Sequence, residues 1–248
     1  MIKNILGRII AFWGAIIFVI TLLLVVIPIW LTNYIEEPGG TEIFRRISKA
    51  WMNFFLFSIG CRLVVHGKEN FKRGETYIVA SNHNSYMDVP LTTPFIPGPN
   101  KTIAKSELAK VPLFGLIYQR GSILVDRKSE KSRRESYVKM KEVLDQGLHM
   151  CIYPEGTRNT TGEPLKSFHD GAFKLAVETK KAIIPTLLFN TKKVLPGKSK
   201  PFYLWPAKME IYFLPPEPVQ PGDTVASLKE RVFNIMYAFA REHSRKGK

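Results

Sequence analysis

Residues 76–88 read TYIVASNHNSYMD and place a histidine and a carboxylate directly after a short hydrophobic run. Tyr, Ile and Val are enriched in strands, so this run predicts a strand at 75–82. The polar residues that follow predict a turn, and a helix is expected to begin near Ser85. The stretch therefore predicts that the strand delivers His83 at its carboxyl end and that the turn brings Asp88 back toward it.

The same alternation of strand and helix signals extends from this stretch in both directions. Short runs rich in Val, Ile, Tyr and Phe predict five more strands, at 62–67, 122–125, 149–154, 182–189 and 208–215. Apolar residues at helical spacing predict helices at 129–146, 170–180 and 224–242. This alternation is typical of an α/β domain with a mainly buried sheet flanked by helices, which we expect to cover residues 61–248. The basic segment 190–206 is predicted to be a solvated loop.

The amino-terminal segment is predicted to lie in a membrane. No charged residue occurs from Ile9 to Ile35, and this apolar run exceeds the roughly 20 residues that cross a bilayer core. A secretory signal peptide has a shorter apolar region, about 7–15 residues, which ends in small residues before the cleavage site. Here the run ends in PIWLTNY at 28–34, without such a pattern. We therefore expect an uncleaved apolar helix over about residues 5–33.

A second helix is predicted over about residues 41–60, and it is amphipathic. Its apolar face carries Phe44, Ile47, Trp51, Phe54 and Phe55, and its polar face carries Arg45, Arg46, Lys49 and Asn53. This pattern suits a helix that lies among the headgroups of an anionic leaflet, although a core helix of the globular domain has the same spacing. Residues 1–60 are accordingly predicted to anchor the protein to a membrane.

The charges near the first helix leave its orientation open. Lys3 and Arg8 favour a cytoplasmic amino terminus, but one full crossing would then export the basic remainder of the chain. Either the amino terminus lies outside, or the two helices form a hairpin that dips into the bilayer. We expect a protein of the inner or cytoplasmic membrane whose α/β domain lies on the cytoplasmic face.

The net charge indicates an anionic partner. The chain has 36 basic and 21 acidic residues, a formal charge of +15, so nucleic acid, a membrane surface and a phosphorylated substrate are the candidates. Most aromatic residues fall in the membrane segments and strands, which argues against a nucleic-acid module. The five histidines and two cysteines lack metal-ligand spacing, so no metal site is predicted. Cys61 and Cys151 are expected to be small core residues.

His83 and Asp88 are candidates for a catalytic pair. A carboxylate that holds one nitrogen of an imidazole raises the basicity of the other, which leaves a general base poised near neutral pH. No G-x-S-x-G nucleophile elbow occurs, and Ser85 is too close in sequence to complete a triad. The base would therefore activate a hydroxyl group of the substrate. A purely structural hydrogen-bonded pair is the alternative.

Two arginines are predicted at strand ends. Arg127 and Arg158 each follow one of the predicted strands. A guanidinium is a planar fork that matches phosphate oxygens, so the two would form an anion site on one rim of the sheet. The alternative is that they form surface salt bridges with Asp126 and Glu155.

Four segments, taken in order along the chain, form a recognisable set: NHNSYMD at 82–88, GSILVDR at 121–127, YPEGTR at 153–158 and IIPT at 183–186. They resemble the four motifs of the glycerolipid acyltransferases, specifically the 1-acylglycerol-3-phosphate acyltransferases. The resemblance implies transfer of an acyl chain from acyl-CoA or acyl-carrier protein to the free sn-2 hydroxyl of 1-acylglycerol-3-phosphate, which gives phosphatidic acid. It implies no cofactor beyond the acyl donor.

The resemblance also implies roles for individual residues. His83 would be the general base, and Asp88 would orient it. Residues of the second and third motifs would hold the phosphate of the acceptor and shape the site, namely Arg127, Glu155, Gly156, Thr157 and Arg158. The segment AKSEL at 104–108 resembles a further family segment, which makes Lys105 a third cation of the site. Pro185 in the last motif would be structural or line the path of the acyl donor.

One segment departs from the family pattern. Members often have Phe-Lys-x-Gly after the third motif, whereas this chain has Phe168-His169-Asp170-Gly171. A different lysolipid acceptor is therefore one alternative, and a non-catalytic membrane protein that binds anionic lipids is another. The expected partners are membrane lipids and, for the enzyme, lysophosphatidic acid with acyl-CoA or acyl-carrier protein.

Overall fold

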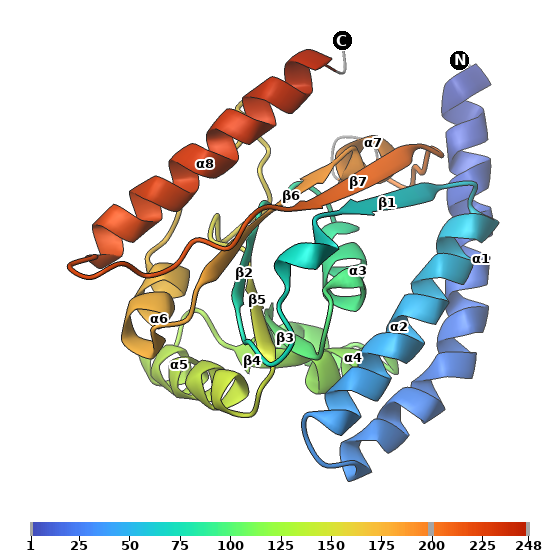
Figure 1. Cartoon of the computed structure of the whole chain (residues 1–248). Helices are drawn as coiled ribbons and strands as arrows, with labels where there is room; N and C mark the ends of the chain where they lie inside the picture. Colours follow the sequence, from blue (N-terminus) through green and yellow to red (C-terminus); the bar gives the residue numbers. More distant parts are fainter. Residues whose placement is uncertain (1, 198–200, 247–248) are drawn as a thin grey trace.

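The computed structural model describes residues 2–197 and 201–246, and a twisted sheet stands at its centre (Figure 1). Within these residues, seven strands form one sheet in the order β1-β7-β6-β2-β5-β3-β4. They are β1 (Arg62–His66), β2 (Ile78–Ser81), β3 (Asn100–Lys105), β4 (Ser122–Val125), β5 (His149–Ile152), β6 (Ile183–Phe189) and β7 (Lys208–Phe213). Strands β6, β2, β5, β3 and β4 are parallel, β7 is antiparallel to β6, and β1 is parallel to β7.

Helices cover both faces of this sheet, which confirms the predicted α/β class (Figure 1). One face packs against α5 (Glu130–Asp145), α6 (Gly171–Thr179) and α8 (Val225–Lys246). The other packs against α1 (Ile2–Leu31), α2 (Gly39–Ser58), α3 (Asp88–Thr92), α4 (Phe114–Gly121) and α7 (Thr191–Val194). Side chains alternate between the two cores along each strand, so Ile78 and Ala80 of β2 enter the first core and Val79 enters the second.

Strand β3 is the one strand of the described sheet that the sequence does not predict, and helix α4 is not predicted either. The sequence of β3, NKTIAK, is mostly polar, although the strand lies between β5 and β4 in the sheet. Hydrogen bonds hold its buried polar side chains: Thr102 Oγ1 donates to the carbonyl of Cys151 (2.9 Å), and Asn100 Nδ2 donates to that of Thr93 (2.9 Å). Within this strand, only Asn100 Oδ1 is buried without a partner among the described residues. Hydrogen bonding thus allows a strand without a hydrophobic run to occupy the interior.

Helices α1 and α2 form an antiparallel hairpin that packs along the α/β part (Figure 1). Near the start of α1, the carbonyl of Gly7 accepts a hydrogen bond from the amide of Leu204 (3.0 Å). Just beyond its end, Thr32 Oγ1 accepts one from Nε of Arg120 on α4 (2.9 Å). Gly7 is needed for this contact, because a side chain there would overlap the ring of Tyr203. Both ends of α1 are therefore fastened to the remainder of the protein.

Most of the aromatic face of α2 points inward, as in the core-helix alternative, whereas Phe54 of the same face is 53% exposed. Phe44, Trp51 and Phe55 are all at most 7% exposed. Trp51 Nε1 donates to Thr21 Oγ1 of α1 (2.7 Å), and its ring centroid lies 5.2 Å from that of Phe18. These aromatic rings therefore form the seam of the hairpin. The large apolar side chains that stay exposed lie mainly on α1 and include Ile9, Phe12, Val19, Leu23, Leu24 and Ile27.

A partly buried ion pair secures the turn between α1 and α2. Arg120 Nη1 contacts Glu37 Oε1 at 2.7 Å, and Lys101 Nζ of β3 contacts the same oxygen at 3.2 Å. Burial alone would raise the pKa of Glu37, but hydrogen bonds from Arg120 and Thr41 and the charge of Lys101 lower it to about 2. The two cations that share one carboxylate oxygen thus connect the turn to α4 and β3.

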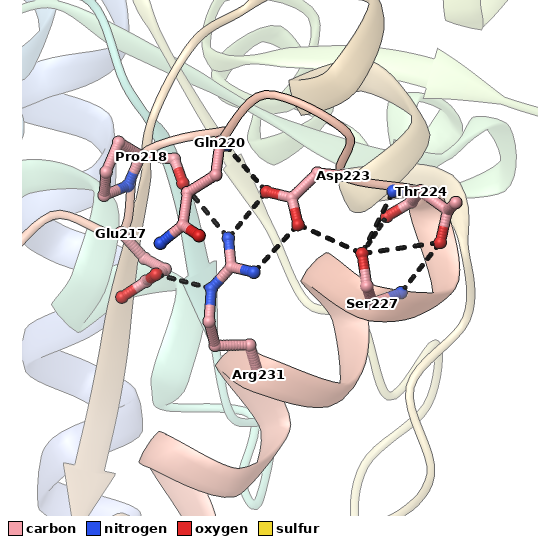
Figure 2. Close-up of polar contacts among 7 residues, drawn as sticks. All are labelled: Glu217, Pro218, Gln220, Asp223, Thr224, Ser227 and Arg231. Carbon is pink, nitrogen blue, oxygen red and sulfur yellow. Dashed lines mark hydrogen bonds and ion pairs between the residues drawn. The ribbon is translucent and has the colours of Figure 1, made fainter.

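A second ion cluster fixes the start of α8, where the predicted helix 224–242 begins (Figure 2). Figure 2 shows the guanidinium of Arg231 between two carboxylates: Nε contacts Glu217 at 2.6 Å, and Nη2 contacts Asp223 at 2.7 Å. Asp223 Oδ1 also accepts a hydrogen bond from Ser227 Oγ (3.0 Å). The guanidinium is held by Glu217, Asp223 and the carbonyl of Pro218, so the cluster fastens α8 to the loop after β7.

The segment 190–206 is less solvated than expected. It contains the short helix α7, and Tyr203 and Leu204 are each 5% exposed where they pack beneath α1. The expectation of a solvated connector is therefore wrong for 203–204, because those residues form the dock for the start of α1. Residues 198–200 lie outside the described part of the chain. Cys61 and Cys151 are both buried free thiols, as predicted.

We expect His149 to make stability depend on pH. Burial, helped by the charge of Arg45 and opposed by a hydrogen bond to Pro97, lowers the pKa of its imidazole from 6.5 to about 4. Between these values the unfolded chain takes up a proton that the folded protein refuses, so the free energy of unfolding falls as the pH is lowered from 6.5 toward 4. The loss is about 3 kcal/mol at its end.

Denaturant unfolding of the solubilised protein between pH 4 and 7 tests this, with His149→Gln as the matched variant because its amide does not titrate. The slope of the free energy of unfolding against pH must differ between wild type and variant over this range. Parallel pH dependences of the two free energies would contradict the prediction.

Candidate active site

The predicted site residues follow the carboxyl ends of four adjacent parallel strands. Along the sheet edge the order is β2, β5, β3 and β4. His83 follows β2, the segment 155–158 follows β5, Lys105 is the last residue of β3, and Arg127 follows β4. Because parallel strands end on the same edge of a sheet, these side chains gather on one rim.

His83 and Asp88 form the predicted pair. His83 Nδ1 and Asp88 Oδ2 are 2.8 Å apart, and the carboxylate is fully buried while the imidazole is 18% exposed. The same oxygen accepts hydrogen bonds from the amides of Asn84 (2.5 Å) and Ser85 (2.7 Å), because α3 begins at Asp88 and folds the turn back onto it. A carboxylate that only accepts requires His83 to carry its proton on Nδ1, which leaves Nε2 with a free lone pair.

Ser85 does not take part in this pair. Its hydroxyl donates to the carbonyl of Leu195 (2.8 Å) and accepts from the amide of Met87 (3.2 Å). The hydroxyl therefore closes the turn. Its placement agrees with the absence of a serine triad inferred from the sequence.

The loop after β5 holds the backbone of His83 from two sides. Glu155 Oε1 accepts from the amide of His83 (2.7 Å), and the amide of Asn159 donates to the carbonyl of His83 (2.6 Å). The second oxygen of Glu155 accepts from the amide of Lys166 (2.9 Å). Both carboxylate oxygens thus bind backbone amides, and Glu155 is 1% exposed. Burial raises the pKa of Glu155, although these two amides oppose the rise.

The structure thus places Glu155 against the backbone of His83. A carboxylate turned toward a bound anion would repel it, whereas here the charge is turned onto backbone N–H groups. Its membership of the site stays a prediction, and this contact with His83 favours a shaping role over a direct contact with phosphate.

Gly156, Thr157 and Arg127 lie together beside this loop. Arg127 Nη1 donates to the carbonyl of Gly156 (2.5 Å), so the exit of β4 reaches that of β5. Gly156 has a φ of 68° and lies against the ring of His169, where a Cβ would come within 2.7 Å of Cδ2. Both the backbone conformation and this close approach require glycine.

The sequence analysis misses one cation of the rim, Lys166. Its Nζ donates to Thr157 Oγ1 (2.7 Å), so an ammonium group lies beside the Gly-Thr step. The departure from Phe-Lys-x-Gly now has a structural account: His169 packs on Gly156, and Asp170 pairs with Lys229 of α8 at 2.6 Å. A lysine two residues before Phe168 is the signal that could have revealed this cation.

Arg158 is stacked on an aromatic ring. Its guanidinium carbon lies 3.5 Å from the ring centroid of Tyr86, in the loop between His83 and Asp88. Among the described residues, neither Arg127 nor Arg158 forms an ion pair with a carboxylate, so the salt-bridge alternative finds no support. Lys105 is exposed at the same edge.

Pro185 and Asn82 lie in the sheet behind the rim. Pro185 is buried in β6 opposite Ala80, and its carbonyl accepts from the amide of Leu214 (2.9 Å). Asn82, which the sequence analysis did not single out, bonds both the amide (2.7 Å) and the carbonyl (3.1 Å) of Leu188. These bonds tie β2 to β6 just before His83. Among the described residues, no group of His, Cys, Asp or Glu side chains is arranged to hold a metal.

Comparisons with known proteins identify the family of this chain. The Acyltransferase family model matches residues 62–188. The 1-acyl-sn-glycerol-3-phosphate acyltransferase alpha of Ovis aries is 33% identical over 196 residues, which cover 76% of this chain and 66% of the relative. The 1-acyl-sn-glycerol-3-phosphate acyltransferase of Helicobacter pylori is 31% identical over 183 residues, which cover 73% of this chain and 74% of the relative.

The fold has a solved counterpart. The crystal structure of the 1-acyl-sn-glycerophosphate (LPA) acyltransferase PlsC from Thermotoga maritima matches with a TM-score of 0.82 at 20% identity and covers 98% of both chains. That identity supports a likeness of fold alone. The family model and the sequence relatives carry the assignment, and they show that this chain belongs to the acyltransferase family, as a member of its 1-acyl-sn-glycerol-3-phosphate acyltransferase group.

Proposed function

We propose that this protein transfers an acyl chain from an acyl thioester to the free sn-2 hydroxyl of 1-acylglycerol-3-phosphate, giving phosphatidic acid. The observation that carries the proposal is the juxtaposition of the His83–Asp88 pair with a cationic rim on one sheet edge. The names of the relatives support this choice of substrate.

In the proposed mechanism, His83 acts as the general base. Its Nε2 takes the proton of the sn-2 hydroxyl while the hydroxyl oxygen attacks the thioester carbonyl carbon. The buried carboxylate of Asp88 holds Nδ1–H at 2.8 Å and stabilises the imidazolium that forms. When the tetrahedral intermediate collapses, the C–S bond breaks and the imidazolium returns its proton to the leaving thiolate. The step needs no covalent acyl-enzyme.

The cations of the rim would hold the acceptor. Arg127, Arg158, Lys105 and Lys166 surround the exits of β3, β4 and β5, where they would bind the phosphate and bring the hydroxyl close to His83. Holding the acceptor next to the bound acyl donor makes the reaction effectively intramolecular. This is a large source of rate acceleration.

An apolar cavity offers a place for an acyl chain. It has a volume of about 70 Å³ and lies between the helical hairpin and the sheet. Its lining includes Phe18 of α1, Trp51 of α2 and Val89, the residue after Asp88. Because the lining is mostly hydrocarbon and starts beside the catalytic turn, we propose that it receives part of an acyl chain of a substrate.

The hairpin would attach the protein to one face of the membrane. Residues Ile2–Tyr34 are long and apolar enough to cross a bilayer, and α1 exposes apolar side chains such as Phe12 and Leu24 along its length. Both ends of α1 are fastened to the α/β part, so a full crossing would drag that part into lipid. We propose that the hairpin lies in the cytoplasmic leaflet of an inner or cytoplasmic membrane, with the rim facing the cytoplasm.

The test is a substrate panel on the detergent-solubilised full chain, scored by the mass of the lipid product. Acceptors are lysophosphatidic acid and lysolipids with other headgroups, and donors are acyl-CoA and acyl-carrier protein. We expect phosphatidic acid from at least one donor. If only another lysolipid gives a product, that lysolipid is the acceptor in place of lysophosphatidic acid. If neither donor gives a product, a lipid-binding protein without catalysis is favoured.

A further inference from the structure

Tyr86 is the one exposed aromatic side chain within the described turn from His83 to Asp88. Its side chain is 52% exposed, although its neighbours Ser85 and Met87 are buried. The turn is held rigidly, because Asp88 accepts two of its amides and Ser85 bonds the carbonyl of Leu195. The backbone of Gly197 lies beside the ring. A half-exposed ring on so fixed a backbone has no role in the core.

The ring is covered by the guanidinium of Arg158, which comes from a different strand end. The guanidinium carbon lies 3.5 Å from the ring centroid, well within the roughly 6 Å at which a cation is attracted to an aromatic face. The contact therefore joins the turn that carries the base to the loop that carries the predicted phosphate ligands.

A guanidinium stacked on a ring keeps its N–H donors free, whereas a guanidinium in a salt bridge does not. Stacking uses the flat face of the group, so its N–H donors, which point outward in the plane, remain available for oxygen atoms. A salt bridge to a carboxylate would use two of those donors and cancel the charge. The structure thus keeps Arg158 both ordered and charged.

We propose that Tyr86 is a positioning residue that holds Arg158 ready for the phosphate of the acceptor. The inference rests on the proposed function and assigns a role to a residue of the first motif for which the resemblance implies none. Tyr86 itself does not touch the phosphate. It restricts the long side chain of Arg158 before the substrate arrives, so less conformational freedom is lost on binding.

The test compares Tyr86→Leu, which removes the ring but keeps an apolar side chain, with Tyr86→Phe, which keeps the ring. We expect Tyr86→Leu to raise the KM for lysophosphatidic acid about 3- to 10-fold while kcat and the KM for the donor stay within twofold of wild type. Tyr86→Phe should restore the wild-type KM, because the aromatic face alone holds the guanidinium. Thermal unfolding midpoints of both variants should match wild type, since the side chain is half exposed.

The decisive experiment makes the Tyr86→Leu substitution in a protein that already carries Arg158→Ala. There Tyr86→Leu should cause no further rise in the acceptor KM, because the group that it positions is gone. An equal rise with and without Arg158 would overturn the proposal, and so would a Tyr86→Phe variant that behaves like Tyr86→Leu. A fall in kcat or a change in the donor KM would assign Tyr86 to the catalytic turn and likewise overturn it.

These outcomes separate the two proposals. A wild-type protein that makes no phosphatidic acid overturns the proposed function. An active wild type whose acceptor KM is unchanged by Tyr86→Leu overturns only the role of Tyr86.

Discussion

His83→Ala is expected to lower kcat for acyl transfer by about three orders of magnitude, within the range that positioned general bases contribute. The variant removes Nε2, the atom proposed to take the proton of the acceptor hydroxyl. No neighbouring group can replace it, because Asp88 is buried and Ser85 is bonded to Leu195. The measurement is kcat with lysophosphatidic acid and the preferred donor.

His66→Ala is the matched control for this variant. His66 ends β1 at the far edge of the sheet, and its side chain is 42% exposed, so its loss should leave kcat unchanged. Both variants should still sediment with lipid vesicles, because the hairpin is intact in each. A purified His83→Ala protein that keeps a tenth or more of wild-type kcat would contradict the mechanism.

Asp88→Asn is expected to lower kcat by about two to three orders of magnitude, because a neutral amide no longer stabilises the imidazolium. The oxygen Oδ2 accepts three N–H groups, from His83, Asn84 and Ser85. The other oxygen is buried without a hydrogen-bond partner among the described residues. The amide NH2 must therefore face either three donors or no acceptor, which should also lower the free energy of unfolding by about 1–3 kcal/mol.

Kinetics and thermal unfolding of the same preparation test both effects, with Asp145→Asn at the exposed end of α5 as the control. The two readouts also separate the catalytic pair from the purely structural pair that the sequence left open. A lower unfolding midpoint with near wild-type kcat would show that the pair is structural only.

The sheet and most of its helices could be predicted from the sequence because their signals are local. The run HMCI of β5 is wholly buried, and α5 starts at Ser129, whose side chain accepts from the amide of Ser132 as an N-cap. Strand β3 gives no such local signal, since its sequence is mostly polar and the buried Thr102 is accommodated by a hydrogen bond to Cys151, which is distant in sequence. The amphipathic pattern of α2 was correct, but which face meets the protein depends on α1.

The candidate site could be predicted to a similar degree. His83, Asp88, Arg127 and Arg158 follow strands, so the topology of a parallel sheet brings them to one edge. Contacts across the rim could not be predicted, because they depend on where separate loops meet. The stack of Arg158 on Tyr86 and the bond from Lys166 to Thr157 belong to this class.

The fastening of α1 at both ends has a mechanical consequence for a reaction at a bilayer surface. Leu204 holds Gly7, and Arg120 holds Thr32 and Glu37, so hydrogen bonds at both ends tie α1 to the α/β part. With the hairpin in the proposed leaflet, we expect these contacts to set the height of His83 above the hydrocarbon, which a flexible tether would let vary. An acceptor hydroxyl buried too deep or raised too far by its headgroup would miss the base, so depth in the membrane becomes a criterion of substrate selection.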